Sequence, residues 1–261
     1  MSRISEVFAK LKSKRRGGFI PFITAGDPDL SVTEKLLCEL AQAEADIIEV
    51  GVPFSDPVAD GPVIQRASER ALKRGTNVKS VLDCVAAVKR QIDVPIVLFS
   101  YYNPLLQFGL EHLATAASRA GVDAILVTDL IPEEATTWTP ILAANNLDPI
   151  FLVAPTTSAD RLKLIAQRAR GFVYAVSRTG VTGAREDINE SAESLVRRIQ
   201  TVTPLPVAVG FGISTPAQVR EVWRYADAAV VGSAIVSEIE RLAGDHYLVR
   251  KIGQFVRNLI Q

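Results

Sequence analysis

The sequence predicts an α/β protein built as a single (β/α)8 TIM barrel, in which eight parallel strands are enclosed by helices. The chain has 261 residues, close to the roughly 250 typical of this fold. Beyond Gly17, short apolar runs alternate with amphipathic segments, which is typical of parallel strands buried on both faces and separated by helices. No shift in composition and no low-complexity linker marks a boundary, so residues 1–261 are expected to form one domain.

The predicted strands are short apolar runs, and they lie at Phe19–Thr24, Asp46–Val50, Pro95–Ser100, Asp123–Thr128, Pro149–Val153, Gly171–Val176, Pro206–Gly210 and Asp227–Val231. Helices are expected between them, at Ser31–Ala43, Val78–Ile92, Leu110–Ala120, Glu133–Asn145, Ala159–Ala169, Glu190–Thr201 and Pro216–Tyr225. An extra N-terminal helix is expected to close the barrel floor, because apolar residues from Ile4 to Leu11 recur at helical spacing. A short helix is expected after the eighth strand, beginning at Ala234.

Charge and cysteine content exclude several classes of protein. Lysine and arginine together number 29, as do aspartate and glutamate, which argues against a nucleic-acid or anionic-membrane partner. Cys38 and Cys84 lie in helix-like segments without a second pair, so neither a disulfide framework nor a zinc cluster is expected. No apolar run approaches the ~20 residues of a membrane span, and residues 1–18 lack the apolar core of a signal peptide. A cytoplasmic location is therefore expected.

Glu49 is the first candidate for chemistry. Alternation along the second predicted strand places it opposite Ile48 and Val50, facing either the barrel interior or the underside of a helix. Both places are poor in water, where an unpaired carboxylate is strongly unfavourable unless it is protonated or hydrogen-bonded. Glu49 is therefore either half of a structural ion pair with an arginine or a catalytic acid–base with a raised pKa.

The loop Val52–Pro62, which follows, is stiffened by three prolines and carries Asp56 and Asp60 near the expected barrel mouth. In such barrels, chemistry lies on the loops that follow the strands. Either aspartate could instead cap the helix that begins near Pro62, and composition alone leaves both roles open.

Glycine-bearing loops follow the last three predicted strands and suggest a phosphate site. They are Ser177–Gly183, Gly210–Ser214 and the pair Gly232 and Ser233. Free backbone amides in such loops, together with the positive end of a short helix, bind a dianion. One such loop could be a simple turn, but three at successive strand ends favour a phosphate-bearing ligand.

Other chemistries have no residues at the expected places. No predicted strand contains a lysine, so Schiff-base and pyridoxal-phosphate chemistry lack a nucleophile there. His112 and His246 fall in helical stretches far apart in the sequence, and no metal site is expected. Tyr101, Tyr102 and Tyr174 lie at or near strand ends, where each fills the core or offers an aromatic wall with a polar tip.

The segment Ile48–Pro62 resembles the signature of tryptophan synthase α chains. Further matching segments run along almost the whole chain, at Phe22–Pro28, Tyr102–Pro104, Asp129–Glu134, Ser177–Gly183, Gly210–Ile213 and Val231–Ser233. The resemblance implies a carbon–carbon lyase of tryptophan biosynthesis, which cleaves indole-3-glycerol phosphate into indole and glyceraldehyde 3-phosphate by a retro-aldol reaction.

The resemblance also implies roles for individual residues. Glu49 would exchange protons with indole C3 and with the glycerol hydroxyl, and Asp60 would stabilise positive charge at the indole nitrogen. The substrate pocket would be lined by Phe22, Tyr101, Tyr174, Thr182 and Phe211, with Tyr101 preferred over Tyr102. The loop Ser177–Gly183 would close over the pocket and bring Thr182 to Asp60. The phosphate would rest on Gly183, Gly212, Gly232 and Ser233.

The same resemblance implies no cofactor in this chain and a partner β subunit that carries pyridoxal phosphate in an α2β2 heterotetramer. The β subunit would receive indole through a tunnel and be coupled allosterically to the α site. Asp56, Asn103 and Pro132 match the interface positions. Two rival functions remain open, a stand-alone lyase that releases free indole and a catalytically silent activator of the β subunit. The presence of both Glu49 and Asp60 disfavours the silent activator.

Overall fold

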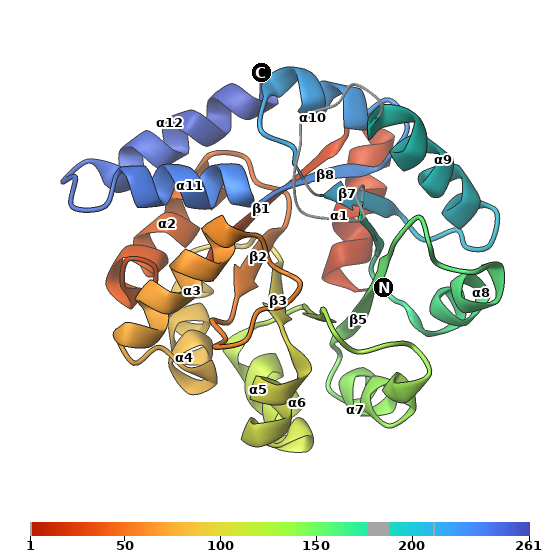
Figure 1. The fold of residues 1–261 in the computed structure, drawn as a ribbon, viewed down its shortest axis with the longest axis horizontal. Helices are drawn as coiled ribbons and strands as arrows, with labels where there is room; N and C mark the ends of the chain where they lie inside the picture. Colours follow the sequence, from red (N-terminus) through yellow and green to blue (C-terminus); the bar gives the residue numbers. More distant parts are fainter. Residues whose placement is uncertain (1, 177–187, 211) are drawn as a thin grey trace.

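Eight parallel strands form a closed barrel in a computed structural model that describes residues 2–176, 188–210 and 212–261. The strands pair in chain order, and β8 pairs with β1 to close the ring. They are β1 (Gly18–Thr24), β2 (Ile48–Gly51), β3 (Ile96–Ser100), β4 (Ala124–Val127), β5 (Asp148–Val153), β6 (Val173–Val176), β7 (Val207–Gly210) and β8 (Ala228–Val231). Each predicted strand overlaps one of these, and helices surround the ring (Figure 1). The predicted fold class is confirmed.

The helices are α1 (Arg3–Ser13), α2 (Leu30–Gln42), α3 (Pro62–Lys73), α4 (Val78–Val88), α5 (Tyr102–Phe108), α6 (Leu110–Ala120), α7 (Trp138–Ala144), α8 (Ala159–Arg168), α9 (Ile188–Gln200), α10 (Pro216–Val222), α11 (Ser233–Arg241) and α12 (Leu248–Ile260), with a 3-10 helix η1 (Glu134–Thr136). The N-terminal helix and the helix after β8 were both predicted. Neither α5 nor α12 was, and His246 lies in the turn that joins α11 to α12 rather than in a helix.

The single helix predicted over Glu133–Asn145 is wrong, because the chain forms η1 and then begins a new helix, α7. Pro140 gives the physical reason. In a continuous helix it would lie in the interior, where proline removes a hydrogen bond and clashes with the preceding turn. With the restart at Trp138, Pro140 falls in the first turn of α7, where its missing N–H is not needed.

The helix α1 closes the end of the barrel at which the strands begin, as predicted. Its apolar face places Ile4, Phe8 and Leu11 in one cluster with the inward side chains of the strands. The rings of Phe8 and Phe172, which precedes β6, have centroids 5.8 Å apart. The floor of the barrel is therefore filled with side chains and offers no path through it.

Polar contacts fix α1 and the residues that flank it to the starts of the strands. They join Ser2 to Asp148, Arg3 to Asp123 and Arg16 to Asp46. Each of these aspartates lies at, or just before, the first residue of a strand. The carboxylates of the floor are thus occupied by structural partners, and they leave chemistry to the opposite end of the barrel.

Side chains alternate between the barrel interior and the layer between strands and helices. Ile47 belongs to the interior cluster with Tyr174, whereas Ile48 and Val50 pack in the outer layer against the helices. Since Glu49 is two residues from Ile47, it shares the inward face. Of the two orientations that the sequence left open for Glu49, the structure has the one that faces the barrel interior.

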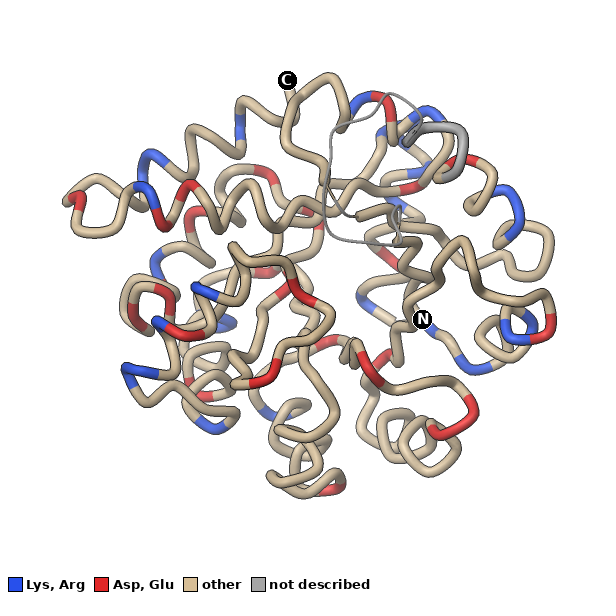
Figure 2. Tube along the Cα trace, viewed as in Figure 1, with Lys and Arg blue, Asp and Glu red and all other residues tan. Residues whose placement is uncertain are grey.

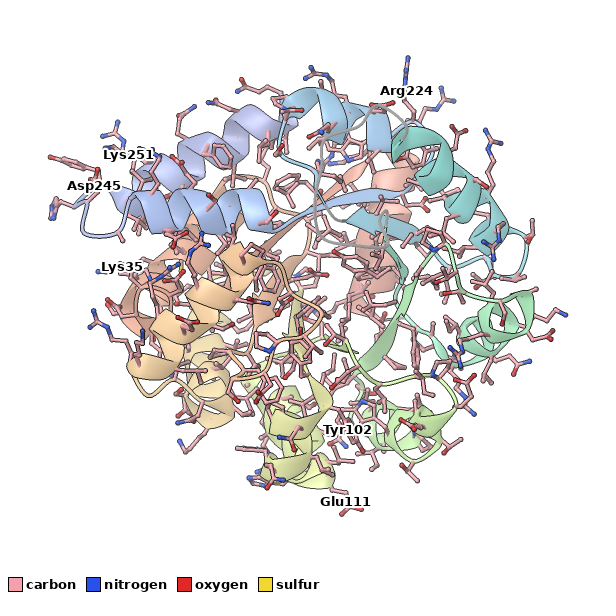
Figure 3. The ribbon with its side chains drawn as sticks, viewed as in Figure 1. Lys35, Tyr102, Glu111, Arg224, Asp245 and Lys251 are labelled. Carbon is pink, nitrogen blue, oxygen red and sulfur yellow. The ribbon has the colours of Figure 1, made fainter. Side chains whose placement is uncertain are left out.

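Basic and acidic residues are interspersed along the outer helices (Figure 2). In the part of the chain that the structure describes, no helix combines the length and apolarity needed to cross a membrane. At the edge of the barrel, the carboxylate of Asp245 and the ammonium group of Lys251 lie 2.5 Å apart beside the turn between α11 and α12 (Figure 3). The charges of the outer surface are thus locally balanced.

Candidate active site

Glu49 lies at the centre of the candidate site, inside the barrel near the carboxyl ends of the strands. Its side chain is 1% exposed, and its Oε1 has no hydrogen-bond partner among the described residues. Burial raises the pKa of this carboxyl to about 8. No described arginine pairs with it, so the ion-pair alternative is not supported, and at neutral pH the group holds a proton that it can donate.

The buried carboxyl of Glu49 makes stability depend on pH. Its pKa rises from 4.5 in the unfolded chain to about 8 in the folded one, so the folded state retains a proton that the unfolded state has released. As the pH rises from 4.5 to about 8, the free energy of unfolding therefore falls by roughly 1.4 kcal/mol per pH unit.

Glu49→Gln cannot titrate and is therefore expected to gain stability relative to wild type across this pH interval and to keep a constant difference above it. Urea unfolding of both proteins at pH 5, 6, 7 and 8 measures the change. Curves of ΔG against pH that run parallel for the two proteins would contradict the raised pKa.

Asp60 lies on the loop between β2 and α3, where the residue that caps α3 is Gly61, without a side-chain cap. Neither Asp56 nor Asp60 therefore caps the helix. The Asp60 side chain instead lies beside the Tyr101 hydroxyl. Burial raises the pKa of Asp60 to about 6, and the neighbouring Tyr101 hydroxyl partly opposes this rise. At neutral pH the group is an anion at the edge of the barrel interior.

Tyr101 holds this loop in place from the end of β3. Its hydroxyl accepts a hydrogen bond of 3.0 Å from the Ala59 N–H, and its ring lies 5.2 Å, centroid to centroid, from that of Phe54. Tyr101 is 3% exposed, whereas Tyr102 begins α5, outside the strand ring (Figure 3). Of the two tyrosines, Tyr101 is therefore the one that contacts the loop carrying Asp60, and its preference over Tyr102 as the pocket residue stays a prediction.

Tyr174 and Phe22 form aromatic surfaces beside the carboxylates. Burial raises the pKa of Tyr174 well above its usual value, and the nearby Glu49 and Asp60 carboxylates raise it further. The Tyr174 hydroxyl therefore stays protonated. That hydroxyl occupies the space of a side chain at Gly210, because a Cβ there would lie 2.0 Å from it. Phe22 packs edge-on against Phe99, with ring centroids 5.1 Å apart.

The described residues of the mouth enclose a small cavity, in which about 10 Å³ is open to the centre of a water molecule, room for about one water. Its walls are Phe22, Thr24, Gly51, Val52, Asp60, Ile64, Ser68, Phe99, Ser100 and Tyr101. Sequence patterns do not point to Thr24, Ser68 or Ser100 as site residues. Thr24 is 3% exposed, and its hydroxyl has no described partner. Thr24 is two residues after Phe22 on β1, so the two side chains share one face of the strand. This spacing is the sequence feature that could have predicted Thr24 as a site residue.

The expected phosphate site is described in part. Gly232 precedes α11, and no side chain caps this helix, so the first amides of α11, beginning at Ser233, have no partner within the helix. Gly212 has a φ of +77°, the left-handed backbone that favours glycine. Thr182, Gly183 and Phe211 lie outside the described residues.

The expected partner residues follow successive strands on the same rim: Asp56 follows β2, Asn103 lies in α5 after β3, and Pro132 follows β4. Asp56 and Asn103 are exposed, whereas Pro132 is buried. The Tyr102 N–H, after β3, donates a hydrogen bond of 2.7 Å to the Oδ1 of Asp129, after β4. This bond joins the two segments. Pro132 can thus shape the rim but presents little surface of its own.

Large apolar side chains are exposed beside these three residues. Val58 is 85% exposed, Leu106 47% and Ile131 40%. They follow β2, β3 and β4 respectively, so the apolar surface lies on the loop side of the barrel. These side chains leave apolar surface on the loop side of the barrel that a partner protein could cover.

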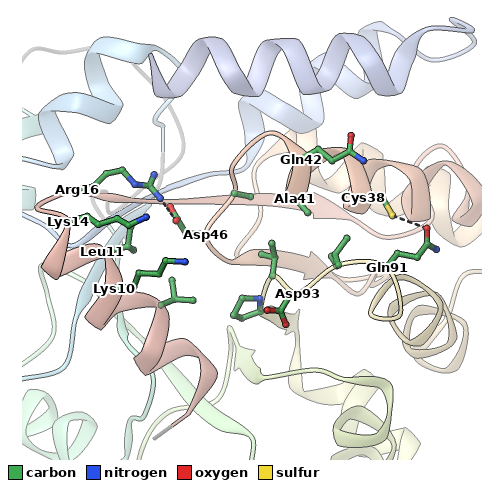
Figure 4. A pocket seen from close by; sticks show the side chains of 15 residues that line it. Lys10, Leu11, Lys14, Arg16, Cys38, Ala41, Gln42, Asp46, Gln91 and Asp93 are labelled. Atoms are coloured by element: carbon green, nitrogen blue, oxygen red, sulfur yellow. Dashed lines mark hydrogen bonds and ion pairs between the residues drawn. The ribbon is translucent and has the colours of Figure 1, made fainter.

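A second cavity, of about 570 Å³, lies at the opposite end of the barrel, between α1 and the segments that precede β2 and β3 (Figure 4). Lys10, Lys14, Asp46 and Asp93 are among the residues that line it. None of the predicted site residues does. Its larger volume does not mark it as the site of catalysis, because the catalytic residues of this fold lie at the carboxyl ends of the strands.

Among the described residues, no group of three or more His, Cys, Asp or Glu side chains is placed to hold a metal ion. The ring of His112 stacks on Phe108, with centroids 4.9 Å apart, and His246 lies edge-on to Tyr247. Both histidines are exposed and lie against a neighbouring ring at the periphery.

A buried glutamic acid with a raised pKa and a second carboxyl at the mouth of a closed parallel barrel are typical of an acid–base enzyme of the (β/α)8 class. The family model described as "Tryptophan synthase alpha chain" matches residues 8–260. The chain belongs to the tryptophan synthase α chain family.

Individual relatives agree with this assignment. The chain is 52% identical over 259 residues to the tryptophan synthase alpha chain of Geobacter sulfurreducens. The alignment covers 99% of this chain and 98% of the relative. The crystal structure of tryptophan synthase subunit alpha from Legionella pneumophila is 36% identical with a TM-score of 0.91, and covers 100% of this chain and 98% of that one. An aminoacrylate-bound tryptophan synthase from M. tuberculosis is 34% identical with a TM-score of 0.89, and covers 100% of both chains. The predicted family and lyase activity, the cleavage of indole-3-glycerol phosphate, are confirmed.

Proposed function

We propose that Glu49 and Asp60 carry the proton transfers and charge stabilisation by which this chain cleaves indole-3-glycerol phosphate into indole and glyceraldehyde 3-phosphate. The observation that carries the proposal is the Glu49 carboxyl, buried inside the barrel with an unpartnered oxygen. An unpaired buried carboxyl is unfavourable for stability. Its position at the mouth of the barrel therefore favours a role in chemistry.

In the proposed mechanism, Glu49 acts first as an acid and then as a base. With a pKa of about 8 it is protonated at neutral pH, and it donates this proton to indole C3. The protonated ring becomes an electron sink, so the bond between C3 and the glycerol chain breaks as the adjacent hydroxyl becomes an aldehyde. The Glu49 carboxylate accepts the hydroxyl proton, which restores the starting state.

Asp60 is proposed to stabilise the positive charge that develops at the indole nitrogen when C3 is protonated. Its pKa of about 6 leaves it ionised at neutral pH, and its partial burial strengthens the attraction. Tyr101 lies beside the carboxylate, and Phe22 and Tyr174 are proposed to hold the ring, together with Thr182 and Phe211. Gly183, Gly212, Gly232 and Ser233 are proposed to bind the phosphate.

The proposed mechanism predicts a bell-shaped dependence of kcat/KM on pH. The acidic limb should lie near pH 6, where Asp60 loses its charge, and the alkaline limb near pH 8, where Glu49 loses its proton. Initial rates of indole release from pH 5 to pH 9, at substrate concentrations well below KM, give this profile. Activity that rises steadily through pH 8 would contradict the acid role of Glu49.

The overall activity is tested by mixing the purified chain with indole-3-glycerol phosphate and following indole, with and without a β subunit. Production of indole by the chain alone, increased by the β subunit, is the expected result. High turnover that the β subunit does not change would favour the stand-alone lyase. No indole under either condition would favour the silent activator.

We further propose that the chain is a single domain that needs no cofactor of its own, functions in the cytoplasm and binds a β subunit carrying pyridoxal phosphate in an α2β2 assembly. The exposed apolar side chains of Val58, Leu106 and Ile131 support a partner on this rim. Asp56, Asn103 and Pro132 are proposed to take part in this interface. Since the Asp56 loop also carries Asp60, binding of the partner can alter the catalytic site.

Asp56→Asn is expected to weaken activation by the β subunit by roughly tenfold, which corresponds to about 1.4 kcal/mol of affinity, because it removes a charge that is proposed to face the partner. The side chain is exposed, so the isolated chain should keep its turnover. Titration of indole release against β-subunit concentration separates the two effects. An unchanged titration midpoint would remove Asp56 from the interface.

A further inference from the structure

An ion-pair network joins two helices that start at the candidate site. The Arg70 guanidinium of α3 binds both carboxylate oxygens of Asp27, at 2.7 and 2.8 Å. Its remaining nitrogen, Nη1, lies 2.7 Å from the Glu240 Oε1 of α11. Arg66, one turn earlier on α3, binds both Glu240 oxygens at 2.8 and 2.7 Å. Two arginines thus hold two carboxylates, and the charges balance.

The geometry of this network is stiff. The Asp27 side chain is 2% exposed and that of Arg70 28%, so solvent screens the pair weakly. A guanidinium that binds one carboxylate with two nitrogens and another with the third has a fixed orientation. Asp27 follows β1, so the network fixes α3 and α11 to each other and to the barrel.

The opposite ends of the same two helices carry the proposed site. The chain enters α3 directly from Asp60 and Gly61, and the Gln65 side chain donates a hydrogen bond of 2.9 Å to the Asp60 carbonyl. The other helix, α11, begins at Ser233. The helices lie side by side (Figure 1), and both contribute to one apolar cluster with Phe22, through Ala67 and Val236. A shift of either helix therefore changes the spacing between Asp60 and Ser233.

We propose that Arg70 and Glu240 are positioning residues that set the distance between the phosphate site at the start of α11 and Asp60 at the start of α3. This inference rests on the proposed function. The substrate carries its phosphate at one end and its indole nitrogen at the other, so it must reach both places at once. Misplacement by about 1 Å is enough to lower the rate of a well-oriented reaction ~100-fold.

A change in the distance between the two ends of the site affects ligand binding differently from damage at one end. A ligand that occupies one end of the site does not sense the distance between the ends, whereas a ligand that spans the site does. The two probes are glycerol 3-phosphate, which carries the phosphate end alone, and indole-3-propyl phosphate. The second spans both ends but has no hydroxyl groups, so it cannot be cleaved.

Two variants change the network but keep a positively charged partner beside Asp27. Glu240→Gln keeps the pair between Arg70 and Asp27, and Arg70→Lys keeps a positive charge beside Asp27 but loses the two-nitrogen geometry. Each is expected to weaken indole-3-propyl phosphate roughly tenfold and to leave glycerol 3-phosphate within about twofold. In the same variants, kcat/KM for cleavage should fall with the affinity of the longer ligand.

Glu39→Gln is the matched control. Glu39 on α2 pairs with Arg257 on α12 at 2.9 Å, and the two side chains are 18% and 36% exposed. This variant also removes one carboxylate charge from an arginine pair between helices, but neither helix begins at the site. Both ligands should bind it as they bind wild type, while urea unfolding shows a stability change similar to that of Glu240→Gln.

Three results would overturn the inference. Equal weakening of both ligands would show local damage at the phosphate site, and weakening of neither would show that the network only stabilises the fold. A wild-type chain that does not bind glycerol 3-phosphate would refute the proposed phosphate site and this inference with it. If Glu49→Gln or Asp60→Asn retains full turnover, the catalytic assignment fails, but the two-ligand comparison still decides the role of the network.

Discussion

Glu49→Gln is expected to lower kcat by ~100-fold or more and to leave the affinity for indole-3-propyl phosphate nearly unchanged. Glutamine has almost the same shape as glutamic acid but cannot give up and regain a proton. The site is buried and the native carboxyl is protonated at neutral pH, so the neutral amide fits the same environment. Single-turnover rates of indole release, measured at saturating substrate, isolate the chemical step.

Glu49→Asp is the companion variant for this experiment. It keeps a titratable carboxyl but withdraws it from the substrate by one methylene, so its kcat should fall between those of wild type and Glu49→Gln. Turnover of Glu49→Gln at the wild-type rate would exclude Glu49 from the proton transfers. An affinity loss that matches the rate loss would assign the residue to binding instead.

Asp60→Asn is expected to lower kcat by ~100-fold as well, for an electrostatic reason. An amide carries no charge with which to stabilise the protonated indole ring, and removing one preorganised charge contact typically costs about 2.7–4 kcal/mol of barrier. The acidic limb of the pH profile near pH 6 should disappear in this variant, because the group that titrates there is gone. Rates from pH 5 to pH 8 measure both effects.

Asp56→Asn provides the matched control for Asp60→Asn, because it makes the same substitution on the same loop at an exposed position. It should leave kcat of the isolated chain and the acidic limb unchanged. If Asp56→Asn loses turnover and Asp60→Asn loses only the response to a β subunit, the roles assigned to the two aspartates are reversed.

Sequence periodicity was sufficient to predict the barrel, because it depends on local alternation. It left two orientations open for Glu49, since alternation shows which neighbours share a face but not whether that face is turned to the barrel interior or to a helix. The helix predicted over Glu133–Asn145 is wrong because Pro140 breaks the helical pattern there. The link between Tyr101 and Asp60 and the network of Asp27, Arg70 and Glu240 join residues far apart in the chain. A single sequence contains no signal for such pairings, since they depend on how helices settle against the closed barrel.

The floor helix constrains the order in which the barrel can be completed during synthesis. Its apolar face packs against side chains contributed as late as β8, including Phe172 and Val230. Because α1 precedes every strand in the chain, it lacks its packing partners until almost the whole barrel has been synthesised. Until then, Ile4, Phe8 and Leu11 stay exposed on a short amphipathic helix, a type that is marginal on its own in water. The helix α1 is thus made before the strands that cover it and is among the last elements to be buried.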